Sequence, residues 1–180
     1  MTEVIRASGL TETRWVNGAG RKADIATGEG WLLGYAWLDK DAPFSDYSGH
    51  DRTITLIEGP GFSLELPAGS TLTVTNKFQP TAFNGAGPMA CHVLGPCRVL
   101  NAISAYPGFS HTVQVMSGAD FLTHVMAGEG PPSTTNTFAV ILRGSVGDAG
   151  ALDTLRLTEP VTASPDSLVA VIRFERETTA

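Results

Sequence analysis

The chain has 180 residues, of which 42% are hydrophobic and 17% charged, with 20 glycines and 11 prolines. This length can bury the core of one large or two small fused domains, and the frequent turn residues favour short strands over long helices. With 12 basic and 18 acidic residues and a formal net charge of -6, the chain lacks the clustered Lys and Arg that a nucleic-acid partner requires.

The sequence also argues against secretion and against a membrane span. Residues 1–13, MTEVIRASGLTET, include Glu3 and contain no continuous apolar core, so we expect no secretory signal. No apolar run approaches the roughly 20 residues that a membrane helix needs. We therefore expect a soluble cytoplasmic protein with neither a membrane nor a nucleic-acid partner.

A glycine-rich stretch near the start, Trp15 to Gly20, is the first candidate for ligand contact. Glycines allow the backbone to come close to a ligand, so the amide of Asn17 and nearby N–H groups could meet an anion. The alternative is an arm that packs over the fold with Trp15 as a hydrophobic plug. Lys22 and Asp24 follow in an alternating strand and share one face of it.

Turn residues then punctuate the chain about every 8 to 12 residues, which is typical of all-β proteins. The segment Thr53 to Ile57 alternates, with Ile54 and Leu56 on one face, and an antiparallel meander follows over 62–66 and 72–74. Further strands are expected over 89–94, 98–103, 111–116, 121–126, 138–143, 151–157 and 168–174. The sequence therefore predicts an all-β fold.

Three ionisable side chains, His50, Asp51 and Arg52, stand where the alternating segment begins. The planar guanidinium of Arg52 suits a ligand carboxylate, and His50 could act as an acid or base near neutral pH. Either the cluster forms a binding rim, or Asp51 and Arg52 form a structural ion pair with His50 exposed.

Asn101 is a second candidate, because period two places it on the same face as Val99 and Ile103. A polar side chain among β-branched apolar residues needs a hydrogen-bond partner or a cavity. Cys91 and Cys97 are expected to be free, buried structural thiols in a cytosolic chain, although a hairpin bridge is an alternative.

No metal and no cofactor is expected. The four histidines, His50, His92, His111 and His124, contain no His-x-His pair, the spacing that places two histidines on one face of a strand where both could reach one metal ion. A site of two histidines and one carboxylate could still assemble in space.

Two segments echo each other. Thr55 to Gly59 and Val140 to Gly144 are each an apolar strand that ends in a charged residue and a glycine. A leucine-bearing strand and a Pro-containing turn follow each one. This echo favours two stacked jelly-roll barrels over one sandwich.

Four blocks together resemble one known family, HutD/Ves. In chain order they are WVNGAGRKADIA (Trp15 to Ala26), APFSDYSGHDRTITLIEGPGFSLEL (Ala42 to Leu66), FNGAG (Phe83 to Gly87) and LGPCRVLNAI (Leu94 to Ile103). The resemblance covers most of residues 13–105. It implies a bicupin, two double-stranded β-helix barrels in one chain, and we expect cupin-like barrels over 1–105 and 106–180 within a single compact unit.

The chain departs from the family pattern at several positions. Val16 stands where the family usually has lysine, and Val99-Leu100-Asn101 stands where it has Asp-Phe-Asn. Phe83-Asn84-Gly85-Ala86 replaces Phe-Asp-Gly-Asp. A ligand that needs those carboxylates is not implied for this chain.

The resemblance implies a role beside histidine-utilisation enzymes, with which some members are encoded. We expect a non-catalytic protein that binds a small carboxylate metabolite and regulates or assists histidine or amino-acid catabolism. The expected ligand-binding residues are Arg52, Asp51, Asn17, Asn101, Trp15 and Phe44. The alternatives are a metal-independent isomerase or lyase with His50 or His92 as acid/base, and a protein-interaction module that self-associates as a homodimer through an exposed strand edge.

Overall fold

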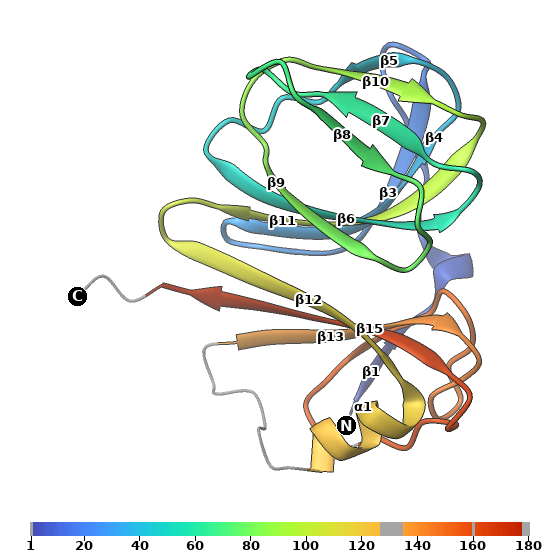
Figure 1. Ribbon diagram of the computed structural model, residues 1–180. Coiled ribbons are helices and arrows are strands. Elements are labelled where there is room, and N and C mark those ends of the chain that lie inside the picture. The colour runs from blue at the N-terminus through green and yellow to red at the C-terminus, as the bar shows by residue number, and fades with distance from the viewer. Residues whose placement is uncertain (1, 127–134, 160, 178–180) are drawn as a thin grey trace. The chain divides into compact units, whose positions relative to one another are not determined.

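The computed structural model describes residues 2–126, 135–159 and 161–177 (Figure 1). The chain divides into two compact units, one formed by residues 11–107 and the other by residues 1–10 together with 108–180. Both are built almost entirely of strands, so the all-β prediction is confirmed. No helix in the described residues is long and apolar enough to span a membrane.

The 11–107 unit holds two antiparallel sheets. One has six strands in the order β2-β3-β4-β11-β6-β9, and the other has four in the order β5-β10-β7-β8. The strands are β2 (Thr13–Arg14), β3 (Gly20–Gly28), β4 (Trp31–Leu38), β5 (Ala42–Phe44), β6 (His50–Glu58), β7 (Phe62–Glu65), β8 (Thr71–Val74), β9 (Pro80–Asn84), β10 (Met89–Val93) and β11 (Cys97–Ala105).

Alternating side chains from both sheets form the core of this unit. Ile54 and Leu56 of β6 pack in one cluster with Phe62 and Leu64 of β7, as period two predicts. Cys91 and Cys97 belong to the same cluster. Both are free and buried, which confirms the prediction of structural thiols.

The second unit is a five-stranded antiparallel sheet in the order β1-β14-β13-β15-β12 with one helix beside it. Its elements are β1 (Glu3–Ile5), the 3-10 helix η1 (Ala7–Gly9), β12 (Phe109–Ser117), α1 (Gly118–Met126), β13 (Thr135–Arg143), β14 (Thr154–Arg156) and β15 (Leu168–Arg176). The expected division placed residues 1–10 in the N-terminal domain. Because β1 pairs with β14, the start of the chain folds with the C-terminal unit instead.

The strand expected over 121–126 is wrong, because these residues belong to helix α1. The helix starts with a reciprocal cap: the Ser117 hydroxyl donates to Asp120 Oδ2 at 2.7 Å and accepts the Asp120 N–H at 3.1 Å. A Ser-x-x-Asp cap of this kind is a helix-start signal in the sequence itself. Phe121 is then fully buried in the core of the second unit.

None of the three sheets closes on itself within the described residues, since each ends in two edge strands. The arrangement of two barrels therefore stays a prediction. The many turns between the strands agree with the composition.

Candidate ligand-binding site

A small pocket of about 50 Å³ lies in the 11–107 unit, against strands of the six-stranded sheet. On β4, Leu32, Gly34 and Ala36 lie on one face, and the small size of Gly34 and Ala36 leaves space that bulkier residues would fill. The pocket is lined by Trp15, Lys22, Asp24, Leu32, Gly34, Tyr35, Ala36, Phe44, Ser45, Tyr47, Arg52, Asn101 and Ile103.

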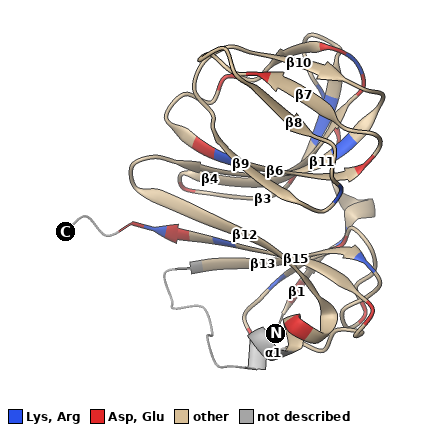
Figure 2. Ribbon diagram, viewed as in Figure 1, with Lys and Arg blue, Asp and Glu red and all other residues tan. Residues whose placement is uncertain are grey.

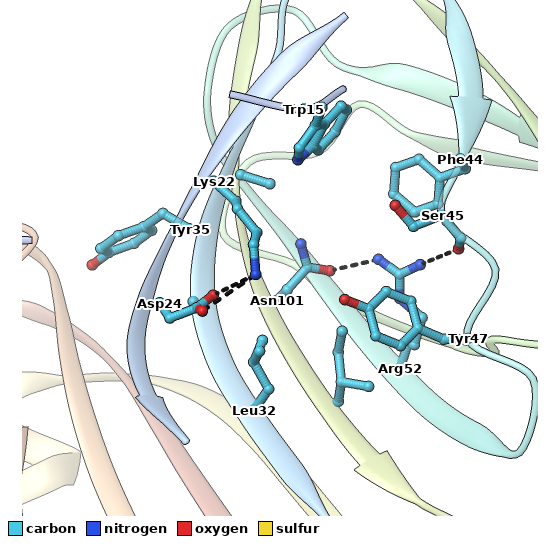
Figure 3. A pocket seen from close by; sticks show the side chains of 13 residues that line it. Trp15, Lys22, Asp24, Leu32, Tyr35, Phe44, Ser45, Tyr47, Arg52 and Asn101 are labelled. Atoms are coloured by element: carbon cyan, nitrogen blue, oxygen red, sulfur yellow. Dashed lines mark hydrogen bonds and ion pairs between the residues drawn. The ribbon is translucent and has the colours of Figure 1, made fainter. Parts of the chain in front are cut away.

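The side chain of Arg52 is the central polar group of this pocket (Figure 3). It is 3% exposed. Its Nη2 donates to Asn101 Oδ1 at 3.1 Å and its Nη1 to the Ser45 carbonyl at 3.3 Å. Its Nε is buried without a hydrogen-bond partner in the described residues.

Aromatic rings surround the guanidinium of Arg52. Its Cζ lies 4.5 Å from the ring centroid of Phe44, 4.9 Å from that of Tyr47 and 5.3 Å from that of Phe83. Such rings attract a cation through their quadrupole, but they do not neutralise its charge. Burial lowers the pKa of Arg52 from its ordinary value to about 10, because desolvation disfavours the charged form.

The pocket lining carries an excess of positive charge. Lys22 and Arg52 are cationic, and Asp24 is the one carboxylate among the lining residues. Lys22 Nζ lies 3.2 Å from both carboxylate oxygens of Asp24, so this carboxylate already has a cationic partner. Figure 3 shows this pair approaching from the side of β3, whereas the Tyr35 side chain lies beyond the strands and points away.

The loop after β5 is held in place by contacts that explain two of the sequence motifs. Asp46 Oδ1 accepts the N–H and the hydroxyl of Ser48 at 2.9 and 2.7 Å, and the Gly87 N–H at 3.2 Å. Gly85 accepts from the Tyr47 N–H at 2.9 Å and donates to the His50 carbonyl at 2.8 Å. These contacts place Tyr47 beside the guanidinium.

Gly85 has room for no larger residue in this arrangement. A Cβ at this position would stand 2.8 Å from the Tyr47 carbonyl oxygen and 2.9 Å from the His50 carbonyl oxygen. The FNGAG block and the PFSDYSGHDR segment thus contact each other, and together they support the pocket.

Four of the six residues expected to bind ligand come together here: Arg52, Asn101, Trp15 and Phe44 all line the pocket. Asn101 faces both a hydrogen-bond partner and a cavity, which are the two roles that its place on the strand predicted. Trp15 is half-buried, and the absence of a Cβ at Gly20 lets its ring pack there, since a Cβ would lie 3.0 Å from it.

Asp51 and Asn17 are not brought into the pocket. Asp51 is exposed, because neighbouring residues of a strand point to opposite faces. Its carboxylate accepts from Asn84 Nδ2 at 3.3 Å, so the structural pair with Arg52 does not form. Asn17 is exposed and its Oδ1 accepts the Ala19 N–H within its own turn at 3.0 Å.

Neither candidate acid/base histidine lines this pocket. The half-buried His50 has its Nδ1 3.1 Å from the Ser48 carbonyl oxygen. His92 lies on the outer face of β10, with Nδ1 3.1 Å from Asp41 Oδ2 and Nε2 3.4 Å from Glu65 Oε1. The hydrogen bond with Asp41 raises the pKa of His92 above its usual 6.5.

Sequence reasoning missed Tyr47 and the Ser45 carbonyl, which come from a loop without periodicity. Lys22 and Asp24 were placed on one face of a strand, but nothing in the sequence indicated that this face meets Arg52. Among the described residues, no group of three or more His, Cys, Asp or Glu side chains is arranged to hold a metal ion.

The fold of this all-β chain is cupin-like, since it is similar to that of a solved cupin. The Cupin 2 conserved barrel domain protein from Leptotrichia buccalis matches 97% of this chain over 96% of its own, with a TM-score of 0.60 at 8% identity. More specifically, the HutD family model matches residues 7–167. The chain belongs to the HutD family, which confirms the resemblance seen in the sequence.

Relatives from three pseudomonads resemble this chain. An uncharacterized 21.2 kDa protein in the hutC 3′ region of Pseudomonas putida is 29% identical over 128 residues, 67% of either chain. A conserved protein of unknown function from Pseudomonas aeruginosa PAO1 has a TM-score of 0.80 at 22% identity, over 99% of this chain and 100% of its own. HutD from Pseudomonas fluorescens SBW25 has a TM-score of 0.77 at 21% identity over the same shares.

Proposed function

We propose that this protein binds the carboxylate of a small metabolite at Arg52, and that it serves histidine or amino-acid catabolism in the cytoplasm as a non-catalytic regulator or accessory. The observation that carries the proposal is a buried guanidinium without a carboxylate partner in the described residues. A charge in such a place is normally paired, because desolvation otherwise opposes it.

The donors of Arg52 are arranged to receive an anion. A guanidinium has five N–H donors in a planar fork, and Ser45 and Asn101 each accept only one of them. An incoming carboxylate could take two parallel N–H bonds and would restore the charge balance of the pocket. It would also find Asn101, whose amide can donate.

The size of the pocket limits the ligand. A volume of about 50 Å³ is well below the roughly 300–1,000 Å³ of pockets that enclose a whole drug-sized molecule. The space suits a carboxylate and little more. The rest of the metabolite would extend toward the half-exposed side chains of Lys22 and Asp24, which could meet a second polar group.

The family and its relatives support the metabolic part of the proposal. The HutD family model matches most of the chain, and one relative is described by its place in the hutC 3′ region. We also infer that the two units are the two barrels of a bicupin. The match of nearly the whole chain to a Cupin 2 barrel protein supports this, as does the strand echo in the sequence.

Titration calorimetry with a panel of carboxylates tests the proposal. The panel contains formate, acetate, glutamate, formylglutamate and urocanate, with histidine included as a zwitterion. We expect at least one carboxylate to bind the wild type and not Arg52→Met. Binding of the same compound to both proteins with equal affinity would contradict the proposal.

Arg98→Met is the matched control. Arg98 lies on the neighbouring strand β11, has Glu58 Oε1 3.7 Å away, and stacks on Trp37 at 4.5 Å. It carries the same charge but does not line the pocket. This variant should keep the wild-type affinity, so a loss in both variants would indicate a general effect of charge.

A further inference from the structure

The edge strands of the three sheets differ in length and in their content of charged residues and proline, and both features affect strand pairing between molecules. Five of the six edges, β1, β2, β5, β8 and β9, are two to five residues long. Four of these five carry a charged residue or a proline. Short edges, charges and prolines are the features that prevent unwanted strand pairing. The sixth edge, β12, is nine residues long.

The sequence of β12, Phe-Ser-His-Thr-Val-Gln-Val-Met-Ser, has no Lys, Arg, Asp, Glu, Pro or Gly (Figure 2). It pairs with β15 along its whole length, from Phe109 opposite Arg176 to Ser117 opposite Leu168, without a register shift. Within the described residues, β15 is its only strand partner. Alternate N–H and C=O groups of β12 therefore point away from β15, along a ladder without a register shift.

We propose that β12 pairs with β12 of a second copy of this chain, antiparallel and about a twofold axis at Val113. This pairing joins two five-stranded sheets into one. Centred on Val113, it uses the full strand: His111 lies opposite Val115 of the partner subunit, and Phe109 opposite Ser117 of the partner subunit. This proposal goes beyond ligand binding and does not depend on it.

The chemistry of the strand favours a second copy over an unrelated partner. When two copies of one strand pair antiparallel about a twofold axis, each side chain lies opposite a residue from the same strand sequence in the other copy. Charged residues in such a strand can therefore be brought close to residues of the same charge. With no Asp, Glu, Lys or Arg in its nine positions, β12 is compatible with itself. On pairing, its half-buried Val113 and Val115 would bury further apolar surface away from water.

Two double variants test the pairing and its register. Thr112 and Gln114 have exposed side chains, so substitutions there spare the core. In the proposed register Thr112 lies opposite Gln114 of the partner subunit. In the double variant Thr112→Lys/Gln114→Lys, a lysine lies opposite a lysine at both symmetric contacts. In the double variant Thr112→Glu/Gln114→Lys, a glutamate lies opposite a lysine at both. Both variants change the same two positions.

Sedimentation equilibrium measures the outcome. We expect the wild type to have about twice the chain mass of 18.9 kDa. The Lys–Lys variant should dissociate with a dimer Kd raised at least about tenfold, and the Glu–Lys variant should remain a dimer. A monomeric wild type would overturn the proposal. So would a dimer that the Lys–Lys variant leaves unchanged, or equal dissociation of both variants.

Hydrogen exchange of the wild type provides a second measurement that needs no variant. The alternate amides of β12 that point away from β15 should lose protection when the protein is diluted below the dimer Kd, while those of β13 should not. Protection of these outward-pointing amides that is independent of concentration would also overturn the proposal.

Discussion

The charge balance at Arg52 makes a quantitative prediction for the protein without ligand. Burial lowers the pKa of the guanidinium from its ordinary value to about 10, which corresponds to a cost of roughly 3 kcal/mol for keeping it charged in the fold. Arg52→Met removes this cost and keeps much of the volume. It also deprives Asn101 Oδ1 and the Ser45 carbonyl of a donor, at about 1 kcal/mol or slightly more each. The two effects nearly cancel.

We therefore expect Arg52→Met to change the free energy of unfolding by no more than about 1 kcal/mol, which is small beside the roughly 3–5 kcal/mol lost when a compensated buried ion pair is broken. Urea unfolding followed by tryptophan fluorescence measures the change. The three tryptophans, Trp15, Trp31 and Trp37, all lie in the 11–107 unit that holds the pocket. The buffer must be free of small carboxylates.

Ligand should separate the free energies of unfolding of the wild type and Arg52→Met, which are nearly equal without it. A carboxylate that binds only the folded wild type adds about 2.7 kcal/mol at a hundredfold excess over its Kd, and it adds nothing to Arg52→Met. The two proteins should thus separate only when the ligand is added. A loss of 4 kcal/mol or more from Arg52→Met in ligand-free buffer, an estimate on the scale of a broken buried pair, would refute the reasoning.

Three further predictions concern the rest of the 11–107 unit. Burial raises the pKa of Cys91 to about 12 and that of Cys97 to about 11, so a thiol reagent at neutral pH should label both only after urea unfolds the protein. Gly85→Ala would place a Cβ against two carbonyl oxygens of the neighbouring loop, and should weaken carboxylate binding at least about tenfold in calorimetry if that loop shifts. The folded pKa of His92 is raised above 6.5 and that of Asp41 lowered below 3.8. Their contact therefore stabilises most between these values, and the stability difference from His92→Gln should fall as pH rises through the folded pKa of His92.

The alternation of side chains along a strand explains which predicted site residues reach the pocket and which do not. It placed Asn101 on the same face of β11 as two apolar residues, where a polar side chain requires a partner or a cavity, and the structure gives Asn101 both. It equally separates Asp51 from Arg52, since adjacent residues of a strand cannot share a face. The alternative of a structural ion pair between Asp51 and Arg52 rested on their closeness in sequence and ignored that rule.

The misses have physical causes as well. Strand β4 is buried on both faces over Leu33 to Ala36, so it shows no alternation from which it could be predicted. The strand prediction over 121–126 rests on apolar content alone, although the Ser117 cap indicates the start of a helix. Tyr47 depends on contacts across more than 30 residues, from Gly85 and Gly87 to its loop, and no local pattern encodes such contacts.

The departures from the family pattern bear on where the charge that balances Arg52 comes from. Val99 stands where a carboxylate is usual, and it is fully buried in the core. Asn84 and Ala86 replace two further carboxylates, and both are exposed. None of these three positions lines the pocket. The one carboxylate that does, on Asp24, contacts a lysine instead. Because the described chain offers Arg52 no anion of its own, its counter-charge must come from a bound ligand or from solvent.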